Sequence, residues 1–177
     1  MTDYLIDTNI LLRASDPNSA QYSLAENAVY HLLNQGHELF LVPQVLIEFW
    51  VVSTRPVAVN GFGWNAQRSK AQIEQFLSQF DLLAETPDTF SYWFQMVHQY
   101  QIQGKRAHDI RILAVMKTYG ITHLLTFNPK DFVDTNELTV VHPQQLDRAL
   151  LIILEPKDIA FPMSKGLITV EPISNPC

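Results

Sequence analysis

Apolar runs of strand length alternate with segments of helical period along most of this chain. The strand-length runs are residues 4–6, 39–42, 82–84, 123–126 and 138–141. Helical patterns lie at about residues 8–14, 19–34, 43–53, 66–79, 89–102 and 107–119, and the glycines placed to end three of these helices in the left-handed conformation are Gly36, Gly104 and Gly120. Strands separated by helices favour right-handed crossovers and a parallel sheet covered on both faces. We therefore predict an α/β fold, a three-layer sandwich whose central, mostly parallel sheet of four to five strands is flanked by helices.

The chain suits one domain, because 177 residues are enough to bury a continuous core without help from disulfides or metal ions. The composition and the hydrophobic pattern change after about residue 150, since residues 154–177 contain four prolines and show no helical period. We expect residues 1–150 to form the main fold and residues 151–177 to form an irregular C-terminal extension of the same domain. Residues 167–170 could add one short strand there.

Composition points to a reducing compartment and away from membranes. The single cysteine is Cys177, so neither an intrachain disulfide nor a cysteine-based zinc site can form. The most apolar window, residues 39–52, contains a proline and a glutamate and is shorter than the roughly 18 to 20 residues of a membrane span. Acids also stand where a signal peptide would carry basic residues, so we expect a cytoplasmic protein. The net charge of -6 argues against nonspecific polyanion binding, unless several acids bind cations.

Two acids follow predicted strands directly. Asp7 comes after the first strand, and Asp131 lies in the loop LLTFNPKDF after the fourth. In parallel sheets, ligands bind just beyond the carboxyl ends of the strands. An ordinary role explains each acid alone, because Asp7 can cap a helix and Asp131 can belong to a turn. Thr8 could provide the cap instead, which would leave Asp7 free for chemistry.

Two further acids lie in helical segments. Glu48 interrupts the apolar run VLIEFW, so we expect its helix to be buried on most faces, and an unpaired buried carboxylate is unfavourable. Glu48 could pair with Arg13 or Arg55, but a cation or a solvated cleft is the favoured explanation. Asp109 stands in the first turn of its helix, where the macrodipole stabilises a carboxylate. The basic residues around Asp109 nevertheless suit an anion that binds there.

Placed at one end of one sheet, the four acids predict a metal site. Two carboxylates about 5 Å apart repel by about 3 kcal/mol at an effective dielectric constant of about 20, so four acids require cations or protons. Hard divalent ions with oxygen ligands meet this requirement. Because no cysteine set and no histidine pair at i, i+4 is available, we expect Mg²⁺ or Mn²⁺ rather than zinc.

A resemblance to a known family rests on four motifs in order, LIDTNILL, VLIEFW, GKRAHDIRILAVMKTYGI and LLTFNPKDF. Together they resemble the PIN-domain ribonucleases, and most closely the VapC-type toxins of bacterial toxin–antitoxin modules, from about residue 3 to residue 143. The resemblance implies a PIN-like nuclease domain over residues 1–150. It implies an Mg²⁺- or Mn²⁺-dependent endoribonuclease that hydrolyses RNA phosphodiesters with a metal-activated water. It further implies the toxin of a type II module, inhibited by an antitoxin protein and commonly a homodimer.

The resemblance also assigns roles to individual residues. The acids implied to bind metal and to serve catalysis are Asp7, Glu48, Asp109 and Asp131, and the supporting polar residues are Thr8, Asn9, Thr126 and Asn128. Basic residues that could hold flanking phosphates are Arg68, Lys70, Lys105, Arg106 and Arg111. Phe62 or Trp64 could stack on an unpaired base or simply pack their loop.

Two other classes of protein are weighed against the nuclease. A PIN-fold interaction module that no longer cleaves would have no reason to keep four like charges in one cleft. Another Mg²⁺-dependent phosphoryl-transfer protein, such as a phosphatase or a receiver domain, would require acid or lysine patterns that Asp7-Thr8-Asn9 does not offer. Assays of RNA cleavage by variants of Asp7 and Asp109 separate these classes.

Overall fold

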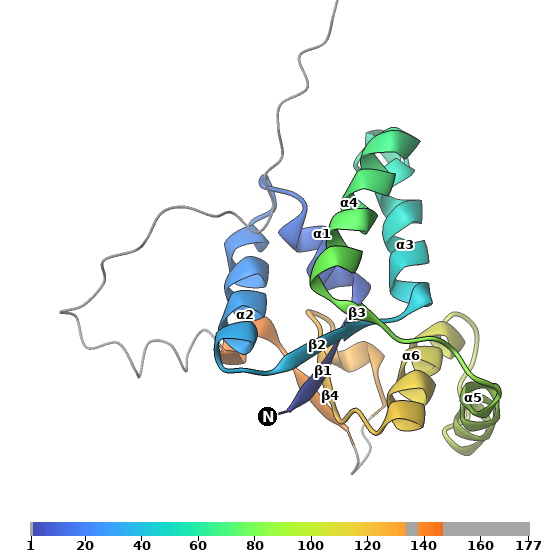
Figure 1. Cartoon of the computed structure of the whole chain (residues 1–177). Helices are drawn as coiled ribbons and strands as arrows, with labels where there is room; N and C mark the ends of the chain where they lie inside the picture. The colour runs from blue at the N-terminus through green and yellow to red at the C-terminus, as the bar shows by residue number, and fades with distance from the viewer. Residues whose placement is uncertain (1, 134–137, 147–177) are drawn as a thin grey trace, which may run out of the picture.

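Five parallel strands form the centre of the fold (Figure 1). The structure is a computed structural model, and it describes residues 2–133 and 138–146. The strands are β1 (Asp3–Ile6), β2 (Glu38–Leu41), β3 (Asp81–Leu82), β4 (His123–Leu125) and β5 (Thr139–Val141), in the order β3-β2-β1-β4-β5. Every neighbouring pair in this sheet is parallel. The predicted α/β sandwich with a mostly parallel sheet of four to five strands is confirmed.

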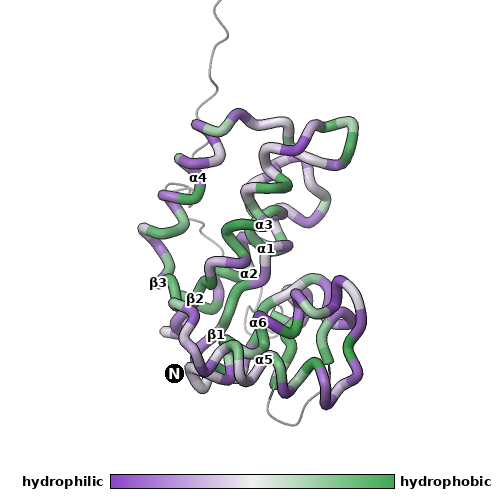
Figure 2. The backbone as a smooth tube through the Cα atoms, turned by 90° about the vertical axis from the view of Figure 1, so that its right-hand side faces the viewer, coloured by the Kyte–Doolittle hydropathy of each residue, from purple (hydrophilic) through white to green (hydrophobic). Residues whose placement is uncertain are grey.

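Helices cover both faces of the sheet. They are α1 (Thr8–Ala14), α2 (Tyr22–Asn34), α3 (Pro43–Thr54), α4 (Ala66–Gln79), α5 (Pro87–Gln99) and α6 (Arg106–Tyr119), with short 3-10 turns η1 (Val57–Val59) and η2 (Pro129–Asp131). Figures 1 and 2 show α5 and α6 together at one side of the sheet, while α3 and α4 rise as a pair from the edge formed by β2 and β3. The site described below lies between these two groups of helices.

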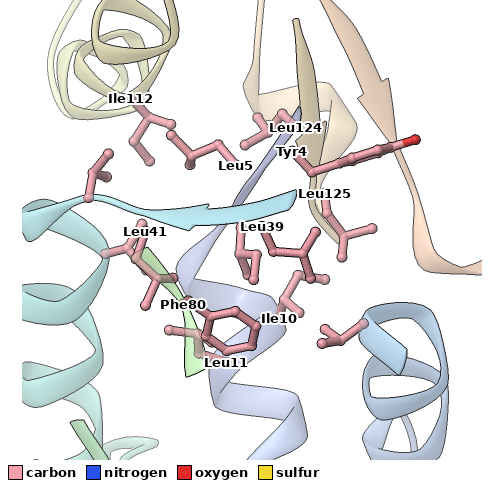
Figure 3. Close-up of a cluster of buried hydrophobic side chains, with 14 of the residues drawn as sticks. Tyr4, Leu5, Ile10, Leu11, Leu39, Leu41, Phe80, Ile112, Leu124 and Leu125 are labelled. Carbon is pink, nitrogen blue, oxygen red and sulfur yellow. The ribbon is translucent and has the colours of Figure 1, made fainter. Parts of the chain in front are cut away.

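The core fills both faces of the sheet. Figure 3 shows Ile112 of α6 beside Leu5 and Leu124 on one side of β2, and Ile10 of α1 beside Leu39 on the other. All five side chains are at most 5% exposed. Burial on both faces explains why the strands are continuous apolar runs in the sequence rather than alternating patterns.

The glycines that were expected to end helices behave differently from one another. Gly120 is the C-cap of α6 with φ 70°, as predicted, and Gly36 follows α2 with φ 77°. The prediction for Gly104 is wrong, because α5 ends at Gln99 and the left-handed residue after it is Gln101, with φ 50°. Gly104 instead belongs to the turn that leads into α6.

The expectation that α3 would be buried on most faces is also wrong. Phe49 is fully buried, but Ile47, Trp50 and Val51 are exposed by 59%, 38% and 47%. An apolar sequence does not reveal which sides of a helix its neighbours cover. Glu48 therefore lies half-buried at the border of an exposed apolar face.

The C-terminal predictions fall outside the described residues. They are the extension at residues 151–177 and the short strand at residues 167–170. Within the described part of the chain, no helix combines the length and the apolar character needed to cross a membrane.

Candidate active site

Asp7 and Thr126 become neighbours because β1 and β4 run side by side. Ile6 and Leu125 pair as the last residues of the two strands, and the backbone N–H of Asp7 continues the ladder by donating to the Leu125 carbonyl at 3.0 Å. The carboxyl ends of parallel strands meet at one edge of a sheet, where loops leave room for ligands. The register of two apolar strands therefore brings together two polar residues that are 119 positions apart in sequence.

The Asp7 carboxylate accepts three hydrogen bonds. The backbone N–H of Thr8 donates to Oδ1 at 2.7 Å, while the Thr126 hydroxyl and the Asn9 amide both donate to Oδ2 at 2.6 Å. Asp7 is thus the N-cap of α1, and the expectation that Thr8 would cap the helix in its place is wrong. Capping occupies only one oxygen, and the other is held by the side chains of Asn9 in α1 and of Thr126, which directly follows β4.

Burial dominates the electrostatics of Asp7. Only 8% of the residue is exposed, and this burial raises the pKa of its carboxyl group from 3.8 to about 6. Hydrogen bonds from Thr126 and Thr8 lower the pKa, whereas the nearby carboxylates of Glu48 and Asp109 raise it further. A cation in this position would stabilise the ionised form that burial and like charge oppose.

Asn9 and Thr126 connect the ends of β1 and β4. Asn9 Nδ2 also donates to Thr126 Oγ1 at 2.9 Å, and Asn9 Oδ1 accepts from the backbone N–H of Phe127 at 2.9 Å. The backbone N–H of Asn128 donates to the same Thr126 hydroxyl at 3.0 Å. These contacts are compatible with the supporting role expected of Asn9, Thr126 and Asn128, and that role stays a prediction.

Glu48 is held by neutral donors. The Thr8 hydroxyl donates to Oε2 at 2.8 Å, and Gln44, one helical turn earlier in α3, donates through Nε2 to Oε1 at 2.8 Å. Gln44 Nε2 also donates to the carbonyl of His108 at 2.9 Å. Gln44 therefore links the glutamate to the first turn of α6.

Neither arginine that was considered as an ion-pair partner of Glu48 takes that role. In residues 2–133 and 138–146, Glu48 forms no ion pair, and Arg13 donates instead to Gln21 at 3.0 Å. Arg55 is the C-cap residue of α3 and lines the same cleft as Glu48. A half-buried glutamate without an ion-pair partner at a cleft wall fits the expectation that it faces solvent or a cation.

Asp109 and Asp131 complete the acidic side of the site. Burial is the main reason that the pKa of Asp109 is raised, and the carboxylates of Asp131 and Glu48 raise it further. Arg106 and His108 act against this shift. Asp131 is exposed at the end of η2, in the segment that follows β4. The two acids thus reach the site from α6 and from η2.

One cleft of about 350 Å³ unites the four acids. Its walls come from the start of α1, from α3, from the first turn of α6 and from the segment around η2. The lining residues are Asp7, Thr8, Asn9, Leu12, Ile47, Glu48, Val51, Val52, Arg55, Asp109, Asn128, Asp131 and Phe132. A larger hollow of about 460 Å³ lies near Met96 and Met116, but none of its described lining residues is an acid. The four acids in its wall, rather than its volume, identify this cleft as the candidate active site.

The basic residues of α6 that were predicted to contact RNA lie around the cleft rather than in its wall. Arg106 is close enough to Asp109 to lower the pKa of that carboxyl group. Lys105 is the exposed N-cap residue of α6. Arg111 pairs with Glu85 at 2.8 Å, so part of its charge is already compensated. All three contacts with RNA stay predictions.

The basic residues of α4 stand at the start of that helix. The guanidinium carbon of Arg68 lies 4.1 Å from the centroid of the Trp64 ring, and Lys70 pairs with Glu74 on the exposed surface. Trp64 is also in edge contact with the buried Phe49, with ring centroids 6.1 Å apart. Trp64 therefore packs its loop against the core, and stacking of Phe62 or Trp64 on an unpaired base stays a prediction.

Two residues of the site were not singled out by the sequence. Gln44 holds Glu48, and Arg55, which was considered only as an ion-pair partner, supplies a cation to the cleft wall. The only signal for Gln44 is its position four residues before Glu48, which places the two side chains on one helical face. Nothing local distinguishes Arg55 from other surface arginines.

An ion would find oxygen ligands in this cleft but no closed cage. Among the side chains that the structure describes, no three Asp, Glu, His or Cys residues converge closely enough to hold a metal by themselves. Mg²⁺ commonly binds one or two carboxylates and keeps several waters, so the donors fit such an ion better than they fit zinc. Gln44 Oε1 is buried and has no hydrogen-bond donor within the described residues, and an ordered water could satisfy it.

Solved structures of toxin–antitoxin proteins share this fold. A chain of VapBC2 from Rickettsia felis, bound to a promoter DNA fragment, is 20% identical, with a TM-score of 0.59 over 80% of this chain and 98% of that one. VapC20 from Mycobacterium tuberculosis, a sarcin-ricin loop cleaving toxin, is 17% identical, with a TM-score of 0.56 over 75% of this chain and 98% of that one. A chain of a toxin–antitoxin complex from Klebsiella pneumoniae is 22% identical, with a TM-score of 0.55 over 79% of this chain and 97% of that one. At these identities the likeness shows a common fold.

The sequence itself shows the family. None of the curated proteins matches the chain. The family model of the PIN domain matches residues 4–138, a segment that includes all four acids of the cleft and most of the sheet. This chain therefore belongs to the PIN domain family.

Proposed function

We propose that this protein is a metal-dependent endoribonuclease and the toxin of a type II toxin–antitoxin system. The observation that carries the proposal is that four acids from four separate segments, Asp7, Glu48, Asp109 and Asp131, line one cleft beyond the carboxyl ends of parallel strands. Burial and like charge raise the pKa values of Asp7 and Asp109, a pattern that is typical of functional sites. Membership of the PIN domain family and the likeness to a toxin described as cleaving the sarcin-ricin loop favour RNA as the substrate.

The residues of the chain would position the acids. A bound Mg²⁺ or Mn²⁺ would supply the charge that lowers the pKa of water and stabilises the oxygens of the transition state. Thr126 and Asn9 hold Asp7, and Thr8 holds Glu48, so that these carboxylates are oriented before any ligand arrives. Such preorganisation reduces the rearrangement needed when substrate binds.

Two arginines would bring the anionic substrate to an acidic cleft. Arg55 lies on the cleft wall, and Arg106 lies near Asp109. Phosphate contacts from arginine fix the register of a nucleic acid without reading its sequence. We infer that these two side chains hold phosphates on either side of the scissile bond.

An antitoxin would cover the apolar face of α3. Ile47, Trp50 and Val51 are exposed there, and Ile47 and Val51 also line the cleft, so a protein seated on this face would close the cleft to RNA. The similar structures include a toxin–antitoxin complex. If the protein product of a short neighbouring reading frame inhibits cleavage, Trp50→Glu should abolish inhibition and leave cleavage intact. A homodimer, common in the family that the sequence resembles, belongs to the same proposal and would be measured by sedimentation.

The deciding experiment is cleavage of a mixed RNA pool with Mg²⁺ or Mn²⁺. Asp7→Asn and Asp109→Asn should each lose activity on the order of a hundredfold or more, because the site would lose a carboxylate ligand. The matched control is Asp3→Asn, since Asp3 is exposed at the opposite end of β1 and should be dispensable. A wild type that is inert with both metals would favour the non-catalytic interaction module. Equal cleavage by the wild type and both site variants would sink the assignment of these acids.

A further inference from the structure

A second hollow, of about 340 Å³, opens beside the start of α6. Its walls include the rings of Phe90 and Trp93 from α5, and His108 and Arg111 from α6. We call it the α5–α6 pocket. It is separate from the acidic cleft, but His108 directly precedes Asp109, which lines that cleft. The first turn of α6 therefore stands between the two hollows.

Phe90 of the pocket wall and its neighbour Phe94, which lies outside that wall, form an exposed aromatic surface. Phe90 and Phe94 are exposed by 65% and 62%, and their rings are nearly parallel, with an interplanar angle of 9° and centroids 6.1 Å apart. Trp93 lies 5.6 Å from Phe90 and is fixed by a 2.8 Å hydrogen bond from Nε1 to the carbonyl of Ala107. Unlike Trp64, these two phenylalanines contribute little to the core. They offer flat faces on which another ring can stack.

Positive charge lies next to the pocket rather than in its wall, where Arg111 is paired with Glu85. Lys105, Arg106 and Arg111 cluster at the start of α6, where the helix dipole is also positive. Glu85 compensates Arg111 in part. In a chain with a net charge of -6, this local excess of cations next to exposed aromatic rings is complementary to a nucleic acid strand. A two-fold contact between copies of the chain would instead set the cationic patch against itself.

We propose that the α5–α6 pocket binds one unpaired nucleobase of single-stranded RNA, adjacent to the scissile phosphate. This subsite rests on the proposed nuclease function, and it names the residues that would hold the base next to the cleavage point. The base stacks on Phe90, and the backbone crosses the first turn of α6, where Lys105 and Arg106 contact its phosphates. The acids of the cleft then meet the neighbouring phosphodiester.

The test compares two aromatic truncations with a matched control. The double variant Phe90→Ala, Phe94→Ala removes the stacking faces. Tyr30→Ala removes a 54% exposed ring of α2, a helix that lies on the opposite side of the molecule from α5 (Figure 1). The probe is a single-stranded RNA of about eight nucleotides and mixed sequence, bound in EDTA and cleaved with Mn²⁺. We expect the double variant to bind about tenfold more weakly and to show an equal rise in KM with kcat unchanged. Tyr30→Ala and Phe90→Tyr, which keeps the ring, should match the wild type.

The outcomes separate the pocket from the proposed nuclease activity. If the wild type cleaves RNA and the double variant keeps its Kd and KM, the pocket proposal is overturned and the nuclease proposal stands. Ring-dependent binding in EDTA without cleavage in either metal would support the pocket and overturn the nuclease. A double variant that changes only its sedimentation mass would identify the face as an interface between copies and overturn the pocket. Since both rings are exposed, an unchanged melting temperature is the check that the variant is folded.

Discussion

Asp7 combines a helix cap with a buried acid, and the burial decides its effect on stability. Its pKa is raised from 3.8 to about 6, so the folded state binds the proton more tightly than the unfolded state does. The stability that this group provides is complete below about pH 4 and is lost as the pH rises through about 6. The shift corresponds to about 3 kcal/mol at most, and relaxation around the ionised group should reduce this to about 1–2 kcal/mol.

We predict that Asp7→Asn gains about 1–2 kcal/mol of stability relative to the wild type when the pH rises from about 4 to about 7 in the absence of divalent ions. Below about pH 4 the difference between the two proteins should stay constant, because Asp7 is then protonated in both states. Urea unfolding in EDTA at the two pH values measures the difference. Asp3→Asn, at the exposed end of the same strand, should change stability by less than about 0.5 kcal/mol at either pH. A difference between Asp7→Asn and the wild type that is the same at both pH values would contradict the argument from burial.

Gln44 is a positioning residue whose importance can be separated from simple packing. Gln44→Met keeps the volume but removes the donor shared by Glu48 and the His108 carbonyl. We expect a loss of about 1–2 kcal/mol in stability and a drop of about tenfold in kcat with a smaller change in KM. The control is Gln72→Met, because Gln72 is a buried glutamine of α4 that does not line the cleft. If both variants retain full kcat, Gln44 serves the fold only.

The turn after α3 positions Arg55 through close backbone packing. Backbone N–H groups of Phe62 and Gly63 donate to the carbonyls of Val52 and Arg55 at 3.1 and 2.8 Å. A Cβ atom on Gly61 would lie 2.0 Å from the carbonyl oxygen of Arg55, a separation that requires the backbone to move. The turn that connects α3 to α4 therefore requires a residue without a side chain at Gly61.

We predict that Gly61→Ala lowers the free energy of unfolding by more than about 2 kcal/mol and raises KM for RNA, because the turn must open and displace Arg55. Gly104→Ala is the comparison, since Gly104 has φ 60° but open space around it. That variant should lose only about 1 kcal/mol from backbone strain. Thermal melts and cleavage kinetics of the two variants measure these effects. Equal losses in both would mean that the close approach at Gly61 is relieved without cost.

The elements of this fold could be predicted because their signals are local, whereas contacts across the fold could not. Apolar runs and helical periods located the five strands and six α-helices of the described residues, although β3 has only two residues and α5 begins at Pro87. The position of Asp7 after β1 also follows from the sequence. The exposed side of α3 and the hydrogen bond from Gln44 to the His108 carbonyl, 64 residues away, depend on how distant elements pack. Asp7 rather than Thr8 caps α1, and the Thr8 hydroxyl donates instead to Glu48, which lies 40 residues away in the sequence.

Taken as one body, the protein carries a net charge of -6 and concentrates four acids in one cleft. A divalent ion bound there would relieve repulsion in the folded state, whereas the unfolded chain holds these acids apart. A ligand that binds only the folded state raises its stability in proportion to the logarithm of ligand concentration over Kd. Metal binding should therefore be visible in stability as well as in activity.

We predict that Mg²⁺ at about ten times its Kd raises the melting temperature of the wild type by about 3–6 °C, equivalent to about 1.4 kcal/mol. Asp109→Asn should show a rise below about 1 °C, because one of the raised-pKa carboxylates that favour the ion is gone. Asp3→Asn should respond like the wild type, and KCl at equal ionic strength should not reproduce the effect, since screening acts on all surface charges. Differential scanning calorimetry of the three proteins measures these shifts. An equal rise in all of them would assign the stabilisation to general screening and would contradict metal binding in the cleft.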